Sequence, residues 1–228
     1  MNFFSKLFGK KNTQEEKKIR SNRDSISTES KTVTQKEVDH ELYPFLSQMD
    51  YEGLIPNNFI VPFLDHYNSD EPKVVISYVT STQDDLWMLD SNDQTEEQFR
   101  LIMDTAQINI EKLELKYTTQ KVFDHKVIGF QRHTFTCEKI LDQNFMIHIQ
   151  KELNADSILV SIPRRSKMLI CDQGAEETIK SKFMNFHYAT YLSDEEDIEQ
   201  ICEDIFVIKN GEIEGVLYMN QDHKKIDR

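Results

Sequence analysis

The sequence predicts an α+β fold in which helices pack on a mainly antiparallel sheet. Residues 158–162 and 168–171 form two short apolar runs around the break Pro163-Arg164-Arg165-Ser166, a pattern typical of buried strands joined by a tight turn. A helical period follows this pair, and elsewhere strands also arrive in pairs between single helices. Near the C-terminus, Asn210-Gly211 is the pair that a two-residue type I′ hairpin turn prefers.

Charge divides the chain at about residue 36. The formal net charge is -13, and residues 1–36 hold nine Lys and Arg against four Asp and Glu, so the remainder carries -18. We therefore expect a basic, disordered tether over residues 1–36 and a single acidic α+β domain over residues 37–228. A body this acidic repels phosphate backbones, which argues against binding of nucleic acid.

The beginning of the tether combines apolar and basic side chains. Phe3, Phe4, Leu7 and Phe8 share one face of a short helix, and lysines surround them. One hypothesis is a weak peripheral contact of residues 3–11 with an anionic membrane surface. The alternatives are a frayed end or a short helix that packs on the body.

Cysteine usage and hydropathy predict a cytoplasmic protein. No run approaches the roughly 18 apolar residues of a membrane-spanning helix, and no signal peptide is recognisable. Cys137, Cys171 and Cys202 are far apart and form no CxxC pair, so we expect reduced, buried thiols.

The first elements of the body are expected over residues 37–80. Val38, Leu42 and Leu46 recur at helical spacing, which predicts a helix that Pro44 limits. Residues 59–64 are expected to form an edge strand, because Pro62 cannot donate to a central ladder. Residues 73–80 are rich in β-branched residues and predict a stronger strand.

A second strand and a helix are expected next. Residues 85–90 are an apolar run that contains Trp87, which we expect in the core. Thr95 and Gln98 have the spacing of a capping box, and one apolar stripe follows them at helical spacing. The residues of that stripe are Phe99, Ile102, Ala106, Ile110 and Leu113.

The second half of the body predicts further strands and helices. Residues 122–129 and 133–140 are expected as strands, and Asp142 or Asn144 as the cap of a helix over residues 145–153. A helix carrying Ile179, Phe183 and Phe186 follows the central strand pair, and Asp194 is expected to begin a shorter acidic one. The order strand–strand–helix thus occurs twice, which is compatible with an internal ββα duplication or with two unrelated units of one pattern.

No stretch of the sequence predicts a catalytic, metal or cofactor site. The seven histidines have no metal-ligand spacing, and GxSxG, GxGxxG and GxxxxGK are absent. Asp84, Asp85, Asp90 and Asp93 could bind a hard cation, but they lack the order of an EF-hand, which favours a solvated turn.

Two charged clusters are candidates for binding. Arg164 and Arg165, adjacent on a turn, could bind an anion bidentately. Pairing with the chain's own carboxylates, such as Asp172, Glu176 or Glu177, is the favoured alternative. The second cluster lies in residues 194–204, where seven of eleven residues are acidic. Its first four residues, Asp194, Glu195, Glu196 and Asp197, are either a solvated face or a docking surface for a basic partner.

The order of these segments resembles that of the YtpQ-like family of uncharacterised bacterial proteins, over about residues 55–220. The resemblance is carried by FIVPFL, by the strand pair that leads to Asp90, by AQINIEKL with Ala106 and Asn109, and by SILVSIPRRSKML. It implies an α+β domain without an established activity. The family usually has Asp shortly after Arg in the central turn, whereas this chain has Ser166.

Two functional hypotheses follow. The first is a non-enzymatic interaction protein whose acidic surface binds a basic partner, for example an immunity-type protein that binds a basic toxin. The second is a hydrolase or an anion-binding enzyme with a site around Arg164 and Arg165.

Overall fold

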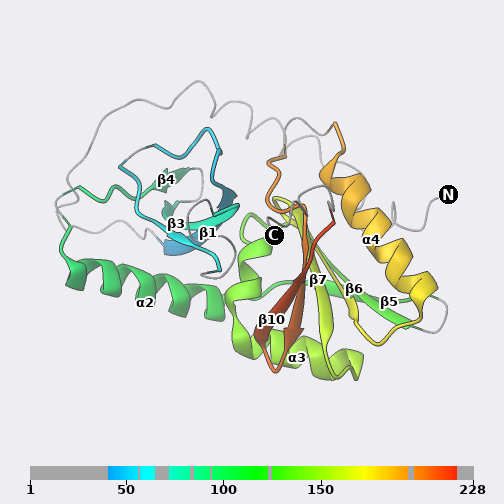
Figure 1. Cartoon of the computed structure of the whole chain (residues 1–228). Helices are drawn as coiled ribbons and strands as arrows, with labels where there is room; N and C mark the ends of the chain where they lie inside the picture. Colours follow the sequence, from blue (N-terminus) through cyan, green and yellow to red (C-terminus); the bar gives the residue numbers. More distant parts are fainter. Residues whose placement is uncertain are drawn as a thin grey trace, which may run out of the picture.

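The residues that the structure describes form two antiparallel sheets and three α-helices, a fold of the α+β class (Figure 1). The structure, a computed structural model, describes residues 41–55, 57–64, 72–82, 85–92, 94–122, 125–194 and 198–219. The predicted tether over residues 1–36 and its apolar segment 3–11 lie outside these residues. None of the helices in the described ranges is long and apolar enough to cross a membrane.

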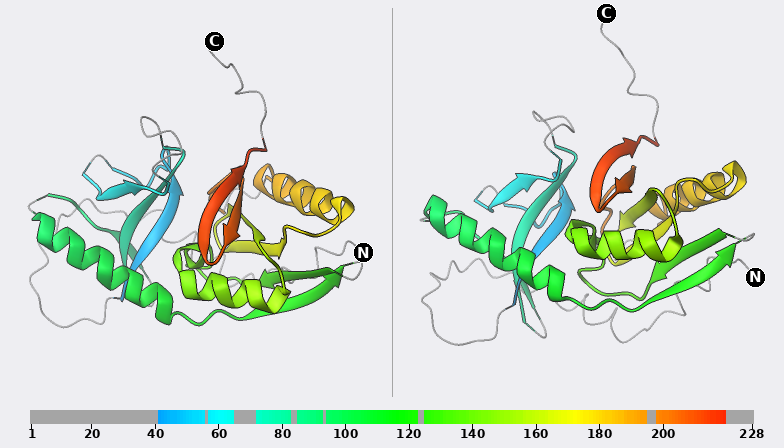
Figure 2. Two further views of the ribbon diagram at one scale, coloured as in Figure 1. Left: turned by 60° about the horizontal axis from the view of Figure 1, so that its bottom comes forward. Right: turned by 90° about the horizontal axis from the view of Figure 1, so that it is seen from below.

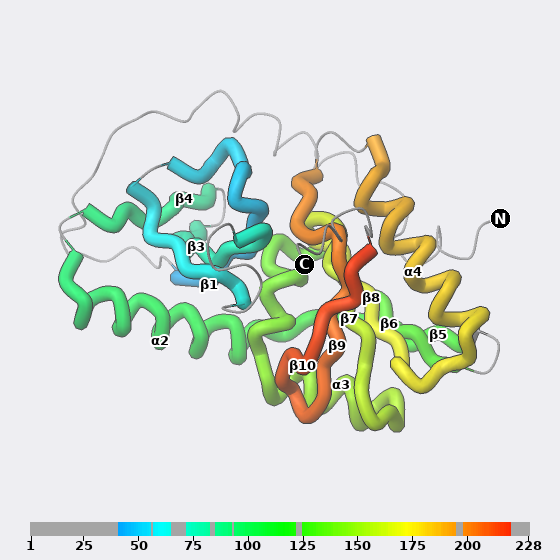
Figure 3. Tube along the Cα trace, in the orientation of Figure 1, coloured from blue at the N-terminus to red at the C-terminus, as the bar shows by residue number. Residues whose placement is uncertain are grey.

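The larger sheet contains the central strand pair that the sequence predicts. Its strand order is β10-β9-β7-β8-β6-β5, and every neighbouring pair is antiparallel (Figure 3). The strands are β5 (Tyr117–Val122), β6 (His125–Phe130), β7 (Ile158–Arg164), β8 (Lys167–Asp172), β9 (Ile205–Lys209) and β10 (Glu212–Leu217). β7 extends one residue beyond Pro163, with a register shift between Ser161 and Arg164.

Helices cover both faces of this sheet (Figures 1 and 2). Ile158, Val160 and Ile162 belong to a core with α3 (Gln143–Leu153), whereas Leu159 belongs to a core with α4 (Glu177–Tyr191). Successive strand residues point to opposite faces of a sheet. A sheet that is covered on both faces therefore needs apolar side chains at consecutive positions of its strands. This explains why residues 158–162 and 168–171 are continuous apolar runs.

The smaller sheet consists of four strands near the N-terminal side of the described chain. Its central strand is β3 (Val74–Ser81), which pairs with β1 (Glu41–Gln48) on one side and with β2 (Ile60–Pro62) and β4 (Leu86–Met88) on the other. Pro62 lies in an edge strand, as predicted. α2 (Glu96–Lys112) packs on β1 and β3, with Ala106 and Ile110 fully buried.

The predicted start of α2 is confirmed. The Thr95 side chain accepts from the amide of Gln98, and the Gln98 side chain accepts from the amide of Thr95 at 2.7 Å. Asp142 caps α3 in the same way, by accepting from the amide of Phe145 at 2.9 Å. At the other end of the fold, Asn210 and Gly211 have φ values of 52° and 82°, as the predicted type I′ turn requires.

Three expectations about single elements are wrong. Leu42 and Leu46 lie in strand β1, not in a helix, and Val38 lies outside the described residues. β1 pairs with β3 along its whole length, and its apolar residues are consecutive because side chains on both of its faces are buried. Residues 133–140 form a turn and the 3-10 helix η3 (Cys137–Leu141), not a strand. Trp87 is 47% exposed on the short edge strand β4, not in the core.

The two sheets share one apolar core. Leu46 of β1 and Val74 of β3 pack in the same cluster as Ile162 and Met168 of the larger sheet. The three cysteines are free and buried, as expected. Both predicted ββα units are present: β3 and β4 of the smaller sheet are followed by α2, and β7 and β8 of the larger sheet are followed by α4. That the two units arose by duplication stays a hypothesis.

Candidate functional site

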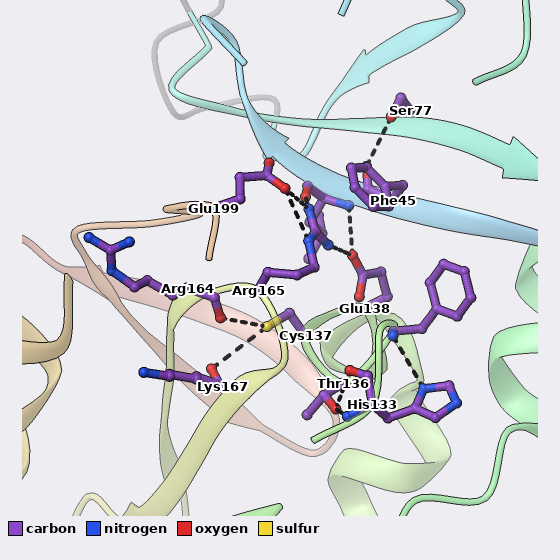
Figure 4. A network of polar contacts seen from close by, with 12 residues as sticks. Phe45, Ser77, His133, Thr136, Cys137, Glu138, Arg164, Arg165, Lys167 and Glu199 are labelled. Carbon is purple, nitrogen blue, oxygen red and sulfur yellow. Dashed lines mark hydrogen bonds and ion pairs between the residues drawn. The ribbon is translucent and has the colours of Figure 1, made fainter. Parts of the chain in front are cut away.

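The turn between β7 and β8 lies where the two sheets meet (Figure 4). Arg164 pairs with Lys167, so Arg165 and Ser166 form a two-residue turn in which Ser166 has a φ of 61°. From this turn the Arg165 side chain reaches β1, where its guanidinium lies 3.7 Å from the centre of the Phe45 ring and donates to the Leu46 carbonyl. We call the ionic cluster around Arg165 the sheet joint.

Two glutamates complete the sheet joint. Glu138 of η3 accepts from Arg165 Nη1 and, at 3.0 Å, from the Leu46 amide. Glu199 accepts from Arg165 Nε at 3.1 Å and Nη2 at 2.9 Å. One guanidinium therefore links strand β1, helix η3 and the segment before β9.

The sheet joint holds two carboxylates against one guanidinium. Glu138 Oε2 and Glu199 Oε1 are buried and have no hydrogen-bond partner among the described residues. Burial raises the pKa of both carboxyl groups, and Arg165 opposes that rise. Removing the guanidinium would leave both acids without their main source of stabilisation.

Arg164 points away from the sheet joint and caps α4. Its Nε donates to the Thr190 carbonyl at 2.9 Å, and its Nη2 donates to the Tyr191 carbonyl at 2.9 Å. Further bonds reach the carbonyls of Ser193 and Ile198. A cation at the C-terminal end of a helix satisfies carbonyls that have no intrahelical donor and complements the helix dipole.

The structure therefore gives both arginines acceptors from this chain. The partners of Arg165 are Glu138 and Glu199, not the sequence neighbours Asp172, Glu176 or Glu177. Asp172 instead accepts from the Gly174 amide at 2.7 Å, and Glu177 pairs with Lys180 at 2.5 Å. The anion-binding hypothesis for Arg164 and Arg165 stays a prediction, and it would require these internal contacts to be displaced.

A buried Ser–His pair lies between β7 and α4. Ser161 Oγ is 2.8 Å from His187 Nδ1, and His187 Nε2 is 2.8 Å from the Glu203 carbonyl. Since a carbonyl only accepts, Nε2 carries the proton and Nδ1 accepts from the Ser161 hydroxyl. His187 has no exposed surface and Ser161 has 1%, so the pair fastens α4 to β7 and is closed to a substrate.

Protonation of His187 is expected to destabilise the fold in acid. Burial lowers the pKa of His187 from 6.5 to about 4. Below pH 6.5 the unfolded chain binds a proton at this residue that the folded chain does not, so stability falls as pH drops from 6.5 towards 4. The loss reaches at most about 3 kcal/mol. Urea unfolding at pH 7 and pH 4.5 measures it.

The control for this pH dependence is His187→Gln, which removes the titrating group. The stability of the variant should change less between pH 7 and pH 4.5 than that of the unaltered protein, because the carboxylates and the other histidines titrate in both proteins. Equal changes in the two proteins would contradict the assignment of the effect to His187.

The predicted acidic docking cluster is only partly described. Asp194 is exposed directly after α4, whereas Glu195, Glu196 and Asp197 lie outside the described residues, as do Asp84 and Asp93. Residues 198–204 are not helical, so the short acidic helix expected after Asp194 does not continue there. Among the described residues, no three His, Cys, Asp or Glu side chains gather in a way that could hold a metal.

The outer face of α2 carries a pattern that the sequence interpretation missed. Acidic and apolar side chains alternate at spacings of four and three along one stripe of the helix, opposite the buried residues. The stripe consists of Glu97, Leu101, Asp104, Ile108 and Glu111, all exposed. Leu101 is 67% and Ile108 49% exposed. We call these five residues the α2 stripe. Their spacing can be seen in the sequence, but the prediction concerned only the apolar stripe that is buried.

No protein-family model, curated protein or solved structure matches this chain. The resemblance to the YtpQ-like family therefore stays a prediction.

Proposed function

We propose that this protein is a non-enzymatic interaction module that binds a basic protein partner through an acidic surface. The observation that carries the proposal is the α2 stripe. Two apolar side chains lie exposed in register with three carboxylates, and no described element covers them. An exposed apolar pair supplies contact area, and the carboxylates attract a basic partner over a longer range.

Charge supports the same partner. The chain beyond residue 36 carries a formal charge of -18, so a basic protein is attracted to it as a whole. Glu97, Asp104 and Glu111 then select the face on which it settles, because complementary charges fix the orientation of an encounter. An immunity-type protein that neutralises a basic toxin would work in this way.

The alternative of an enzyme receives less support from the geometry. Arg164 and Arg165 bind this chain's own carbonyls and carboxylates, and the Ser161–His187 pair is buried. A nucleophile and its base have to reach a substrate. The described residues thus suit a structural role for these groups.

Replacing the stripe carboxylates is expected to slow association with the partner. The partner is first captured from a cell extract at low salt and identified, and its kinetics are then measured with the purified proteins. In the variant Glu97→Gln, Asp104→Asn, Glu111→Gln, we expect the association rate to fall several-fold at low salt and the dissociation rate to change less.

A matched control removes three exposed carboxylates elsewhere: Glu176→Gln, Glu212→Gln and Glu214→Gln. This variant has the same net charge, so it separates the effect of the α2 stripe from that of total charge. An acidic partner, or an equal loss of rate in both variants, would count against the proposed docking face.

A further inference from the structure

A groove of about 510 Å³ lies between the end of α2, the segment that follows it and α3. This volume is within the range of about 300–1,000 Å³ that is typical of ligand sites. Residues that line it include Glu111, Glu114, Leu115, Tyr117, Phe145 and His148. Because Glu111 also ends the α2 stripe, the groove continues the acidic face of that helix.

The side of the groove near η3 contributes no net charge. Lys139 Nζ donates to the carbonyls of Ile110 at 2.7 Å and Glu111 at 3.2 Å, and to Asp142 Oδ2 at 2.6 Å. These three acceptors use its three N–H groups, and Asp142 balances its charge. Asp142 also caps the beginning of α3, which offsets the positive end of that helix.

The charge left in the groove is therefore that of Glu111 and Glu114. Both side chains are exposed; Glu111 lies in the last turn of α2 and Glu114 lies two residues beyond its end, where the helix dipole also favours a cation. His148 is mostly exposed, so water solvates its imidazole. A ligand for this groove should thus carry positive charge at one end.

The apolar wall of the groove is held in place by contacts behind it. The Tyr117 hydroxyl donates to Glu152 Oε2 at 2.7 Å and lies 3.2 Å from His148 Nε2. The Tyr117 and Phe145 rings meet edge to face, with their centres 6.4 Å apart. With Leu115 beside them, these rings offer a fixed apolar surface to the methylene groups of a ligand.

We propose that the groove binds an arginine side chain of the basic partner. The guanidinium lies against the carboxylates of Glu111 and Glu114, and its methylene stem packs on Leu115 and Tyr117. Arginine suits this site better than lysine because its guanidinium is planar, weakly hydrated and able to stack on aromatic rings. The inference rests on the proposed function, which it deepens by naming the side chain that the partner inserts.

The test is a titration of the full-length protein followed by amide chemical shifts. The probe is N-acetyl-arginine amide, and the matched control is N-acetyl-citrulline amide, which has the same shape without the charge. We expect saturable shifts at residues 111–117 and 144–148 with the arginine probe and none with citrulline. Replacing both Glu111 and Glu114 by Gln should weaken binding about tenfold or more.

Two further arms make the result specific. The variant Glu97→Gln, Asp104→Asn changes the α2 stripe outside the groove and should bind the arginine probe unchanged. Shifts of equal size with citrulline, or unaltered binding in the Glu111→Gln, Glu114→Gln variant, would overturn the groove proposal. Absence of arginine binding, together with partner association that still depends on the α2 stripe, would remove the groove and leave the proposed function standing.

Discussion

Replacing Arg165 by Met is expected to destabilise the protein by about 3–5 kcal/mol. The variant leaves the carboxylates of Glu138 and Glu199 buried without their shared cation, and it removes the donor to the Leu46 carbonyl. Met keeps an unbranched apolar stem but not the guanidinium that lies over the Phe45 ring, so the loss reports the ionic contacts and this ring contact together. Equilibrium unfolding in urea at pH 7 measures it.

The charge explanation has its own control in a triple variant. Adding Glu138→Gln and Glu199→Gln to Arg165→Met removes the uncompensated acids, so much of the lost stability should return. If the triple variant is as unstable as Arg165→Met alone, uncompensated charge is not the cause. If Arg165→Met alone does not fold, a folded triple variant would still show that the uncompensated carboxylates cause the loss.

Replacing Ile162 by Asp is expected to cost about 4 kcal/mol or more. Ile162 has no exposed surface and packs in the core that the two sheets share. A carboxylate there would be buried among the apolar side chains of that core. Urea unfolding compares the variant with the unaltered protein.

Leu101→Asp is the matched control for Ile162→Asp, because it introduces the same side chain at an exposed position of α2. Its effect on stability should stay within about 0.5 kcal/mol. A change below about 0.5 kcal/mol for Ile162→Asp would mean that β7 does not lie in the core. A large loss in both variants would instead show that α2 is covered on its outer face.

Elements whose signals are local were predicted from the sequence. The capping box at Thr95, the cap at Asp142 and the turn at Asn210-Gly211 each depend on residues within three or four positions of one another. The central strand pair was also predicted, because its continuous apolar runs and its turn are adjacent in sequence. Interactions between residues close in sequence determine these elements, and the tertiary packing is compatible with them.

Elements that depend on distant partners were not predicted. Leu42 and Leu46 are four residues apart. This spacing places two side chains on the same face of a helix, and also on the same face of a strand. Pairing with β3, about 35 residues away, decides for the strand. A single sheet was expected because nothing in the sequence shows that β1 to β4 pair among themselves.

The candidate sites follow the same division. The sequence identified Arg165 as a charged residue on a tight turn, but its partner Glu138 comes from a segment that was expected to be a strand. Trp87 was expected in the core because it lies within an apolar run, whereas β4 is a three-residue edge strand that leaves it exposed. The groove combines residues of α2, η3, β5 and α3, so no single stretch of sequence could indicate it.

The sheet joint also has a consequence for the order of events during synthesis. Leu46 and Arg165, which it connects, are 119 positions apart, and the bond between Gln48 and Tyr191 spans 143. At roughly 5–20 residues per second, Leu46 is synthesised about 6–24 s before Arg165. In the folded protein the Leu46 amide donates to Glu138 and its carbonyl accepts from Arg165, so this part of the β1 edge lacks its partners until both residues have been made. The smaller sheet can pair within itself earlier, but its joint with the larger sheet forms only after the turn at Arg165 has been made.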